Sequence, residues 1–233
     1  MIPFFNEVES VEAVLIEACA AMQALRRGHE VIAVDDGSSD RTRLQIQGLM
    51  RHWPSLRMLA FDRNRGQAAA LLDGLRAARG RVLITMDGDG QNDPADIATM
   101  LAVLEDSRSD MVTGVRGRRR DGWLRRRMSR LANAVRQRLL HDGVTDSGCA
   151  LKVFRREVRS AFIPIRTLYS FMPALAVAAG YRVKELTVNH RTRDTGVSKY
   201  GLGVMLWRPI LDMLGVWWFT KRRYEEVTPA ILS

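Results

Sequence analysis

The stretch Val82-Leu-Ile-Thr-Met-Asp-Gly-Asp-Gly-Gln91 places a short apolar run directly before two carboxylates and an amide. Residues 82–86 have the length and composition of a buried strand. Asp87 and Asp89 follow it two positions apart, so both can converge on one hard cation, and Gln91 adds a carbonyl oxygen. Mg²⁺ and Mn²⁺ prefer such oxygen ligands and keep positions open for phosphate oxygens. An Asp-x-Asp alone is compatible with a solvated Asp-Gly turn, but its place after a strand favours a metal site.

Strand-like and helix-like segments alternate around this stretch. Strands are predicted over 31–34, 57–61, 82–86, 111–115, 149–155 and 183–190, and helices over 11–27, 41–53, 67–79 and 95–107. Short buried strands that alternate with helices predict an α/β fold with a mostly parallel central sheet. In such sheets ligands bind beyond the carboxyl ends of the strands, which is where the polar clusters fall. No Gly-x-Gly-x-x-Gly and no Walker lysine loop is present, which argues against a dinucleotide-binding or P-loop protein.

The composition and net charge limit the class of protein and the kind of partner that it can bind. The 233 residues are 46% hydrophobic, which is enough for a core, and the formal net charge is +10. That charge indicates an anionic partner, whether nucleic acid, phosphorylated ligand or acidic membrane surface. The two cysteines, Cys19 and Cys149, lie far apart, which excludes a disulfide scaffold and a zinc ribbon and favours a reducing compartment. The first residues lack the basic and apolar regions of a signal peptide.

The longest apolar stretch, 202–219, lies near the carboxyl end and is interrupted by Arg208 and Asp212. It is too polar for a transmembrane helix. Its tryptophans, followed by basic residues at 221–223, are typical of an amphipathic helix on a membrane surface. A helix packed on the domain core is the alternative that this pattern leaves open. We therefore divide the chain into a globular domain over 1–200 and an amphipathic segment with its tail over 201–233.

A second acidic cluster, Asp35-Asp-Gly-Ser-Ser-Asp40, stands at a strand end and opens a helix. Ser39 or Asp40 would make a satisfactory helix cap. A helix cap needs only one such side chain, so capping does not explain the two consecutive acids Asp35 and Asp36. A carboxylate here can accept hydrogen bonds from a base or ribose, or lie near the metal.

Several motifs occur together in a fixed order. They are Pro3-Phe-Phe-Asn6-Glu7, Asp35 to Asp40, Asn64-Arg-Gly66 and Asp87 to Pro94. In this order and spacing they resemble glycosyltransferase family 2, which has the GT-A fold and uses nucleotide-diphosphate sugars. Later motifs at 125–129, 146–152 and 190–200 resemble its polyprenyl-phosphate branch, typified by dolichol-phosphate mannose synthase and bacterial undecaprenyl-phosphate sugar transferases. The resemblance covers residues 2 to about 220.

The resemblance implies a role for each matching residue. The nucleotide-sugar would be bound by Pro3, Asn6, Glu7, Asp36 and Asp87. Mg²⁺ or Mn²⁺ would be held by Asp87, Asp89 and Gln91. The acceptor phosphate would be bound by Arg116, Arg125, Ser129, Arg193, Ser198 and Lys199. The residues expected to act in catalysis are Asp89, Arg125, Arg193 and Lys199. Arginine forks match phosphate oxygens bidentately, whereas lysine acts as a mobile point charge.

The implied reaction is an inverting transfer of sugar to a polyprenyl phosphate, either undecaprenyl or dolichyl. The enzyme would act as a peripheral protein on the cytoplasmic face of the membrane, with no nucleic-acid partner. The lipid phosphate is already anionic, so it needs little help from a general base. Family members begin with a complete apolar strand, whereas here only Met1 and Ile2 precede Pro3, so the first strand is expected to be shortened.

Two other classes remain as alternatives. The first is a soluble family-2 transferase that acts on a protein, glycan or small molecule. The second is a nucleic-acid binder, because Arg116 to Arg138 is basic enough to follow phosphates. The acidic strand ends count against it, since carboxylates repel a nucleic-acid backbone. A processive polysaccharide synthase would show Gln-x-x-Arg-Trp and several membrane spans, and neither is present in this sequence.

Overall fold

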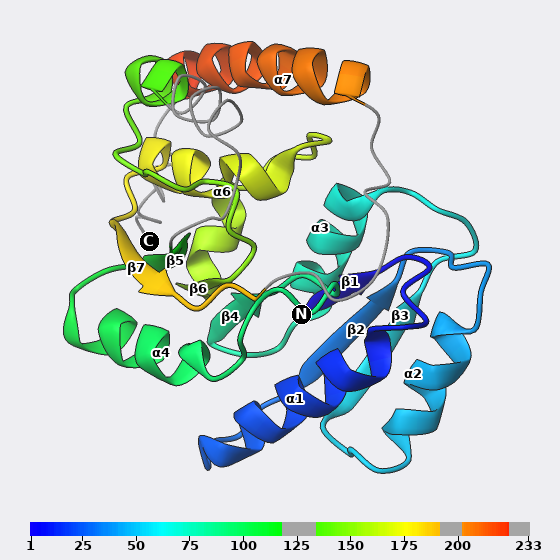
Figure 1. The fold of residues 1–233 in the computed structure, drawn as a ribbon. Helices are drawn as coiled ribbons and strands as arrows, with labels where there is room; N and C mark the ends of the chain where they lie inside the picture. Colours follow the sequence, from blue (N-terminus) through cyan, green and yellow to red (C-terminus); the bar gives the residue numbers. More distant parts are fainter. Residues whose placement is uncertain (118–133, 192–201, 224–233) are drawn as a thin grey trace, which may run out of the picture.

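The structure is a computed structural model that describes residues 1–117, 134–191 and 202–223, with side chains described outside 202–210. Strands and helices alternate along the chain (Figure 1). The strands are β1 (Ile2–Phe4), β2 (Val31–Asp35), β3 (Leu56–Ala60), β4 (Val82–Thr85), β5 (Met111–Arg116), β6 (Lys152–Arg155) and β7 (Val183–Val188). The helices are α1 (Val11–Ala24), α2 (Thr42–Met50), α3 (Gln67–Ala77), α4 (Asp96–Asp106), α6 (Leu168–Ala178) and α7 (Leu202–Arg222), with a 3₁₀ turn at Arg156–Ala161.

The strands form two sheets that meet at the amino end of the chain. The first sheet has the order β1-β2-β3 and is entirely parallel. The second has the order β4-β6-β5-β7, in which β6 runs antiparallel to both neighbours and β5 pairs parallel with β7. Met1 joins the two sheets, because its N–H group donates to Ile84 O at 2.8 Å and its carbonyl accepts from Met86 N at 3.2 Å. The prediction of a mostly parallel sheet flanked by helices is confirmed.

Helices cover both faces of this double sheet (Figure 1). One core lies between the sheet and α1, α2 and α4, and it includes Leu15, Ile46 and Met100. A second core lies against α3 and α6 and includes Leu75 and Phe171. Because both faces are covered, β2 is buried along its whole length, which explains its nearly uninterrupted apolar sequence.

The predicted elements agree with the observed ones to within a few residues, with two differences. The strand predicted over 149–155 is paired only from Lys152 to Arg155. Helix α6 was not predicted, since its sequence contains Pro173, which disfavours a helix interior. The first strand is three residues long, as its shortened sequence predicts. Neither Ser39 nor Asp40 occupies the N-cap position of α2, which is Arg41. Asp40 precedes the cap, and its carboxylate accepts from Thr42 N at 2.9 Å.

Helix α7 has two different faces over residues 211–222, where its side chains are described. One face packs on α6: Val216 is fully buried, and the Asp212 carboxylate accepts hydrogen bonds from the Thr167 amide and hydroxyl. The other face exposes four large apolar side chains, namely Leu211, Leu214, Trp217 and Trp218. Within the described residues, no helix is long and apolar enough to cross a membrane. The alternative of a core-packed helix is therefore correct for one face, and membrane binding by the exposed face stays a prediction.

Candidate functional site

Three predicted motifs lie together at the carboxyl ends of β1, β2 and β4. Asn6 joins the first two of them: its N–H donates to Ser38 Oγ at 3.0 Å, and its Oδ1 accepts from Ser39 N at 2.8 Å. Asn6 has a φ of 53°, in the left-handed region that asparagine tolerates better than most residues. Glu7 N donates to Thr42 Oγ1 at 2.9 Å, which adds a second link. The loops after β1 and β2 are thereby fixed to each other.

The loop after β4 packs against the first motif. The hydroxyl of Ser10 lies 2.9 Å from Gly88 O and 3.2 Å from Glu7 Oε2. A Cβ atom at Gly88 would lie 2.5 Å from the Phe4 ring and 2.7 Å from Pro3 O, so only glycine allows this approach. The glycine of the Asp-Gly-Asp motif therefore brings the two carboxylates close to the residues that follow β1. Ser10 was not among the predicted site residues.

Asp36 holds the Asn64-Arg-Gly66 motif in place. Its carboxylate accepts from Asn64 Nδ2 at 3.1 Å, Arg65 N at 2.7 Å and Gly66 N at 2.9 Å. Its side chain is only 2% exposed, and burial raises its pKa above the usual aspartate value, with Asp35 adding to the effect and the two backbone hydrogen bonds opposing it. The structure therefore gives Asp36 a positioning task in addition to the nucleotide contact expected of it.

Asp87 is held by two neighbours. Gln67 Nε2, at the start of α3, donates to Asp87 Oδ1 at 2.8 Å, and Asp87 N donates to Asn92 Oδ1 at 3.1 Å. Gln91 N donates to Asp89 Oδ1 at 3.2 Å, which orders the turn. Gln67 was not predicted, although its place directly after the Asn64-Arg-Gly66 motif was a usable signal.

The electrostatics of this turn favour a cation. Burial raises the pKa of Asp87 to about 6, and the nearby Asp89 carboxylate adds to the shift. Two positive groups, Lys152 and Arg116, act in the opposite direction. Lys152 is 1% exposed on β6, its ammonium donates to Cys149 O, and burial lowers its pKa. Two carboxylates that repel each other at a partly buried turn are stabilised when a divalent ion binds between them.

The donor set fits Mg²⁺ or Mn²⁺ with substrate oxygens completing the shell. Among the described residues, no three histidine, cysteine or carboxylate side chains converge to form a closed metal site. Asp87 and Asp89 would provide two carboxylates to such an ion, and that they bind it stays a prediction. Mg²⁺ is commonly bound in this way, by one or two carboxylates together with substrate phosphates and waters.

Arg116 is near this turn and already has a carboxylate partner. Its Nε and Nη2 donate to the two Asp146 oxygens at 2.8 and 2.7 Å, and its backbone N–H also donates to Asp146 at 3.1 Å. A Cβ atom at Gly148 would lie 2.8 Å from Arg116 Nη2, so the glycine makes room for the guanidinium. The other residues expected at the acceptor phosphate lie outside the described residues: Arg125, Ser129, Arg193, Ser198 and Lys199. Their roles stay predictions.

The sequence profile of Glycosyl transferase family 2 matches residues 1–162, which include the motifs from Pro3 to Lys152 but not the one at 190–200. This chain belongs to that family. A dodecaprenyl-phosphate galacturonate synthase of Rhizobium johnstonii is 38% identical over 225 residues, covering 95% of this chain and 66% of the relative. An undecaprenyl-phosphate 4-deoxy-4-formamido-L-arabinose transferase of Edwardsiella ictaluri is 36% identical over 204 residues, covering 87% of this chain and 62% of the relative. The family-2 chain thus spans slightly less than two thirds of the length of these relatives.

Solved structures confirm the GT-A fold of this family-2 member. A glucosyl-3-phosphoglycerate synthase of Mycobacterium tuberculosis, in complex with Mn²⁺, uridine diphosphate and phosphoglyceric acid, superposes with a TM-score of 0.71 at 18% identity. The match covers 93% of this chain and 76% of that one. A mannosyltransferase of Pyrobaculum calidifontis, in complex with GDP-mannose and Mn²⁺, gives a TM-score of 0.67 at 21% identity, covering 96% and 64%.

Proposed function

We propose that this chain transfers a sugar from a nucleotide-diphosphate sugar to a polyprenyl phosphate, with inversion at the anomeric carbon. The observation that carries the proposal is that hydrogen bonds link the loops after β1, β2 and β4 at one edge of the sheet. These loops carry Asn6 and Glu7, Asp36, and Asp87 with Asp89, respectively. Two similar proteins support the acceptor class, since the names of both refer to a polyprenyl phosphate.

The donor would bind along this edge. Pro3, Asn6, Glu7 and Asp36 would face the nucleoside, and Asp87 with Asp89, assisted by Gln91, would hold Mg²⁺ or Mn²⁺. The metal ion would neutralise charge on the leaving diphosphate. Gln67 keeps the Asp87 carboxylate oriented through its 2.8 Å hydrogen bond. Oriented ligands raise metal affinity, because the protein need not reorganise when the ion binds.

The acceptor phosphate would approach from the opposite face of the sugar. Arg116, Arg125, Ser129, Arg193, Ser198 and Lys199 are the groups that we propose for binding it. Its oxygen attacks the anomeric carbon while the bond to the nucleotide diphosphate breaks, so one displacement inverts the configuration. No carboxylate nucleophile is needed, and the lipid phosphate arrives without a proton to remove. Cations at the site stabilise the negative charge as it moves from acceptor to leaving group.

A lipid acceptor requires contact with a membrane, and α7 offers a surface for it. Leu211 is 66% exposed and Trp218 is 58% exposed, on the face directed away from α6. Lys221 and Arg222 follow in the last turn of the helix. Exposed aromatic and aliphatic side chains beside basic residues are typical of helices that lie in an anionic interface. We propose peripheral binding at the cytoplasmic face through this surface.

The test compares Asp89→Ala with Asp106→Ala, a matched control at the far end of α4. Donor binding is measured by calorimetry with uridine and guanosine diphosphate sugars, with and without Mn²⁺, and transfer to undecaprenyl phosphate by product analysis. We expect Asp89→Ala to lose Mn²⁺-dependent binding and turnover while both variants keep the unfolding temperature of the parent chain. Transfer to a water-soluble acceptor without any to the lipid phosphate would contradict the proposed acceptor. Retained anomeric configuration would contradict the single displacement.

A further inference from the structure

The chain directly after β7 runs beside the Asp-Gly-Asp turn, which we define as residues 87–91. His190 forms an isolated antiparallel bridge with Asn92, and Arg191 N donates to Gln91 O at 2.9 Å. These pairs join two segments that lie far apart in the sequence. Beyond its last residue, β7 is therefore continued by two residues whose backbone holds the end of the turn.

The turn depends on contacts of this kind for its shape. Two of its five residues are glycines, and Gly90 has a φ of 75°, in the left-handed region. Glycine loses more conformational freedom on ordering than any other residue, so a turn with two glycines is costly to fix. Contacts from outside the turn lower the freedom that remains to be lost when Asp87 and Asp89 bind an ion.

Asn92 connects the base of the turn to the chain after β7. Its Oδ1 accepts from Asp87 N at 3.1 Å, and the residue is only 5% exposed. Its backbone is the part that pairs with His190. One buried residue thus contacts both the start of the turn and the segment that follows β7.

The side chain of Arg191 adds an ion pair on each side of this junction. Its Nη1 lies 2.6 Å from Glu17 Oε2 on α1, and its Nη2 lies 3.1 Å from Asp93 Oδ1. The same Asp93 oxygen accepts from Ala95 N at 3.0 Å, directly before α4. A guanidinium suits this place, because its planar fork presents donors to two carboxylates at once. One arginine therefore joins α1, the segment after β7 and the start of α4 next to Gln91.

Helix α4 has a second, separate anchor to the same segment. Asn189 N donates to Asp96 Oδ2 at 2.7 Å, and Asn189 Nδ2 donates to Asp96 Oδ1 at 3.2 Å. These bonds fix the first residue of α4 without touching the turn. Removing the Arg191 side chain leaves them in place, so a substitution there tests the turn rather than the packing of α4.

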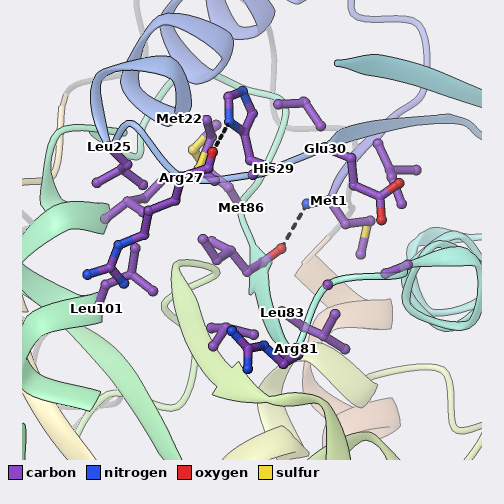
Figure 2. A pocket seen from close by; sticks show the side chains of 18 of the residues that line it. Met1, Met22, Leu25, Arg27, His29, Glu30, Arg81, Leu83, Met86 and Leu101 are labelled. Atoms are coloured by element: carbon purple, nitrogen blue, oxygen red, sulfur yellow. Dashed lines mark hydrogen bonds between the residues drawn. The ribbon is translucent and has the colours of Figure 1, made fainter. Parts of the chain in front are cut away.

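The junction is also separate from the cavity of about 910 Å³ that lies beside β4. Figure 2 shows that cavity with His29 and Arg81 at its wall. None of residues 87–96 and 189–191 lines it. An effect of Arg191 on the turn is therefore expected to act through the contacts listed above and not through the cavity.

We propose that Arg191 is a positioning residue for the Asp-Gly-Asp turn. Through its ion pairs with Glu17 and Asp93 it holds the turn in the form that binds the divalent ion of the donor complex. The inference rests on the proposed function, since that function assigns the ion to Asp87 and Asp89. A turn that already has its bound form loses less freedom when the ion binds, so the affinity is higher.

The experiment measures Mn²⁺ binding by calorimetry, in the presence of whichever of uridine and guanosine diphosphate the parent chain binds. It compares Arg191→Ala with Arg182→Ala, a matched control directly before β7, where an exposed arginine pairs with Asp110 at 3.4 Å. We expect Arg191→Ala to weaken Mn²⁺ binding roughly three- to tenfold, less than the loss of a residue that contacts a metal ligand directly. The control should bind as the parent does. Both variants should lose a similar, small amount of melting temperature, because each loses exposed ion pairing.

Further variants separate positioning from a general loss of stability. Glu17→Ala should also weaken Mn²⁺ binding, whereas Glu12→Ala, at another exposed position of α1, should not. Adding Glu17→Ala to Arg191→Ala should cause no further loss, because both changes remove the same ion pair. Arg191→Lys should recover part of the affinity, since an ammonium group can pair with one of the two carboxylates.

Three results would count against the inference. Equal Mn²⁺ affinity in Arg191→Ala and Arg182→Ala would overturn it and leave the proposed function intact. Parent-like affinity in Glu17→Ala, or losses that add in the double variant, would also overturn it, because the two residues would then act separately. A parent chain that binds no Mn²⁺ would contradict the metal site of the proposed function, and this inference with it.

Discussion

Gln67 Nε2 donates a hydrogen bond to Asp87 Oδ1 at 2.8 Å, which ties the start of α3 to the end of β4. The residue before it, Gly66, donates its backbone N–H to Asp36 Oδ2 at 2.9 Å. Two consecutive residues therefore contact the carboxylates of two separate acidic motifs. This arrangement makes the beginning of α3 the element that sets the spacing between the loops after β2 and β4.

Gln67→Ala should weaken Mn²⁺ binding about tenfold, because a residue that orients a metal ligand typically contributes this much to affinity. Calorimetric titration with Mn²⁺ in the presence of nucleoside diphosphate measures the change. Gln47→Ala is the matched control, since Gln47 is exposed on α2. Equal affinities for the two variants would show that Asp87 does not need this hydrogen bond to bind the ion.

Mn²⁺ binding should also depend on pH. Because the pKa of Asp87 is raised to about 6 in the metal-free fold, a proton competes with the ion below that value. The apparent Mn²⁺ affinity should fall by about tenfold per pH unit below pH 6 and be constant between pH 7 and 8. Titrations at pH 5, 6, 7 and 8 measure it, and Asp87→Asn should remove the dependence along with most of the affinity. An affinity that is constant down to pH 5 would exclude Asp87 as a ligand.

Asp36→Ala should destabilise the fold by about 3 kcal/mol, because it removes the acceptor of the Arg65 and Gly66 amides and of Asn64. Urea unfolding gives the free energy. Asp36→Asn should recover part of the loss, since its carbonyl oxygen can still accept from one or two donors. A loss below 1 kcal/mol in Asp36→Ala would mean that the Asn64-Arg-Gly66 loop keeps its place without this carboxylate.

The exposed face of α7 should bind anionic vesicles. Trp218→Glu and Leu214→Glu should each reduce sedimentation with vesicles that contain phosphatidylglycerol, because they place a negative charge in the interface. Leu44→Glu on α2 is the control. Leu44 is 65% exposed, so it is an apolar side chain at least as accessible as Leu214 and Trp218 but on another helix. Deleting the segment after Tyr200 is less informative, because it would also uncover α6, against which Val216 packs. If all three variants sediment equally, α7 does not contact the membrane.

Local sequence determined the elements and the motifs that end them. Short apolar runs located β2 and β4, and helical spacing located α1, because each pattern is complete within its own few residues. The Asp-Gly-Asp turn was also recognisable, since carboxylates directly after an apolar run lie at the ligand-binding edge of a parallel sheet. Helix α6 was missed because its residues are apolar nearly throughout and include a proline, so no periodic face was visible.

Tertiary structure alone decided which residues meet across long distances in the chain. Nothing local to Gln67 indicates that it reaches Asp87, and nothing near Arg116 indicates Asp146 as its partner. The antiparallel insertion of β6 between β4 and β5 depends on pairing between segments about seventy residues apart. The two faces of α7 differ only because α6 covers one of them. Burial and strand pairing arise because all the elements pack together, and the local sequence does not specify them.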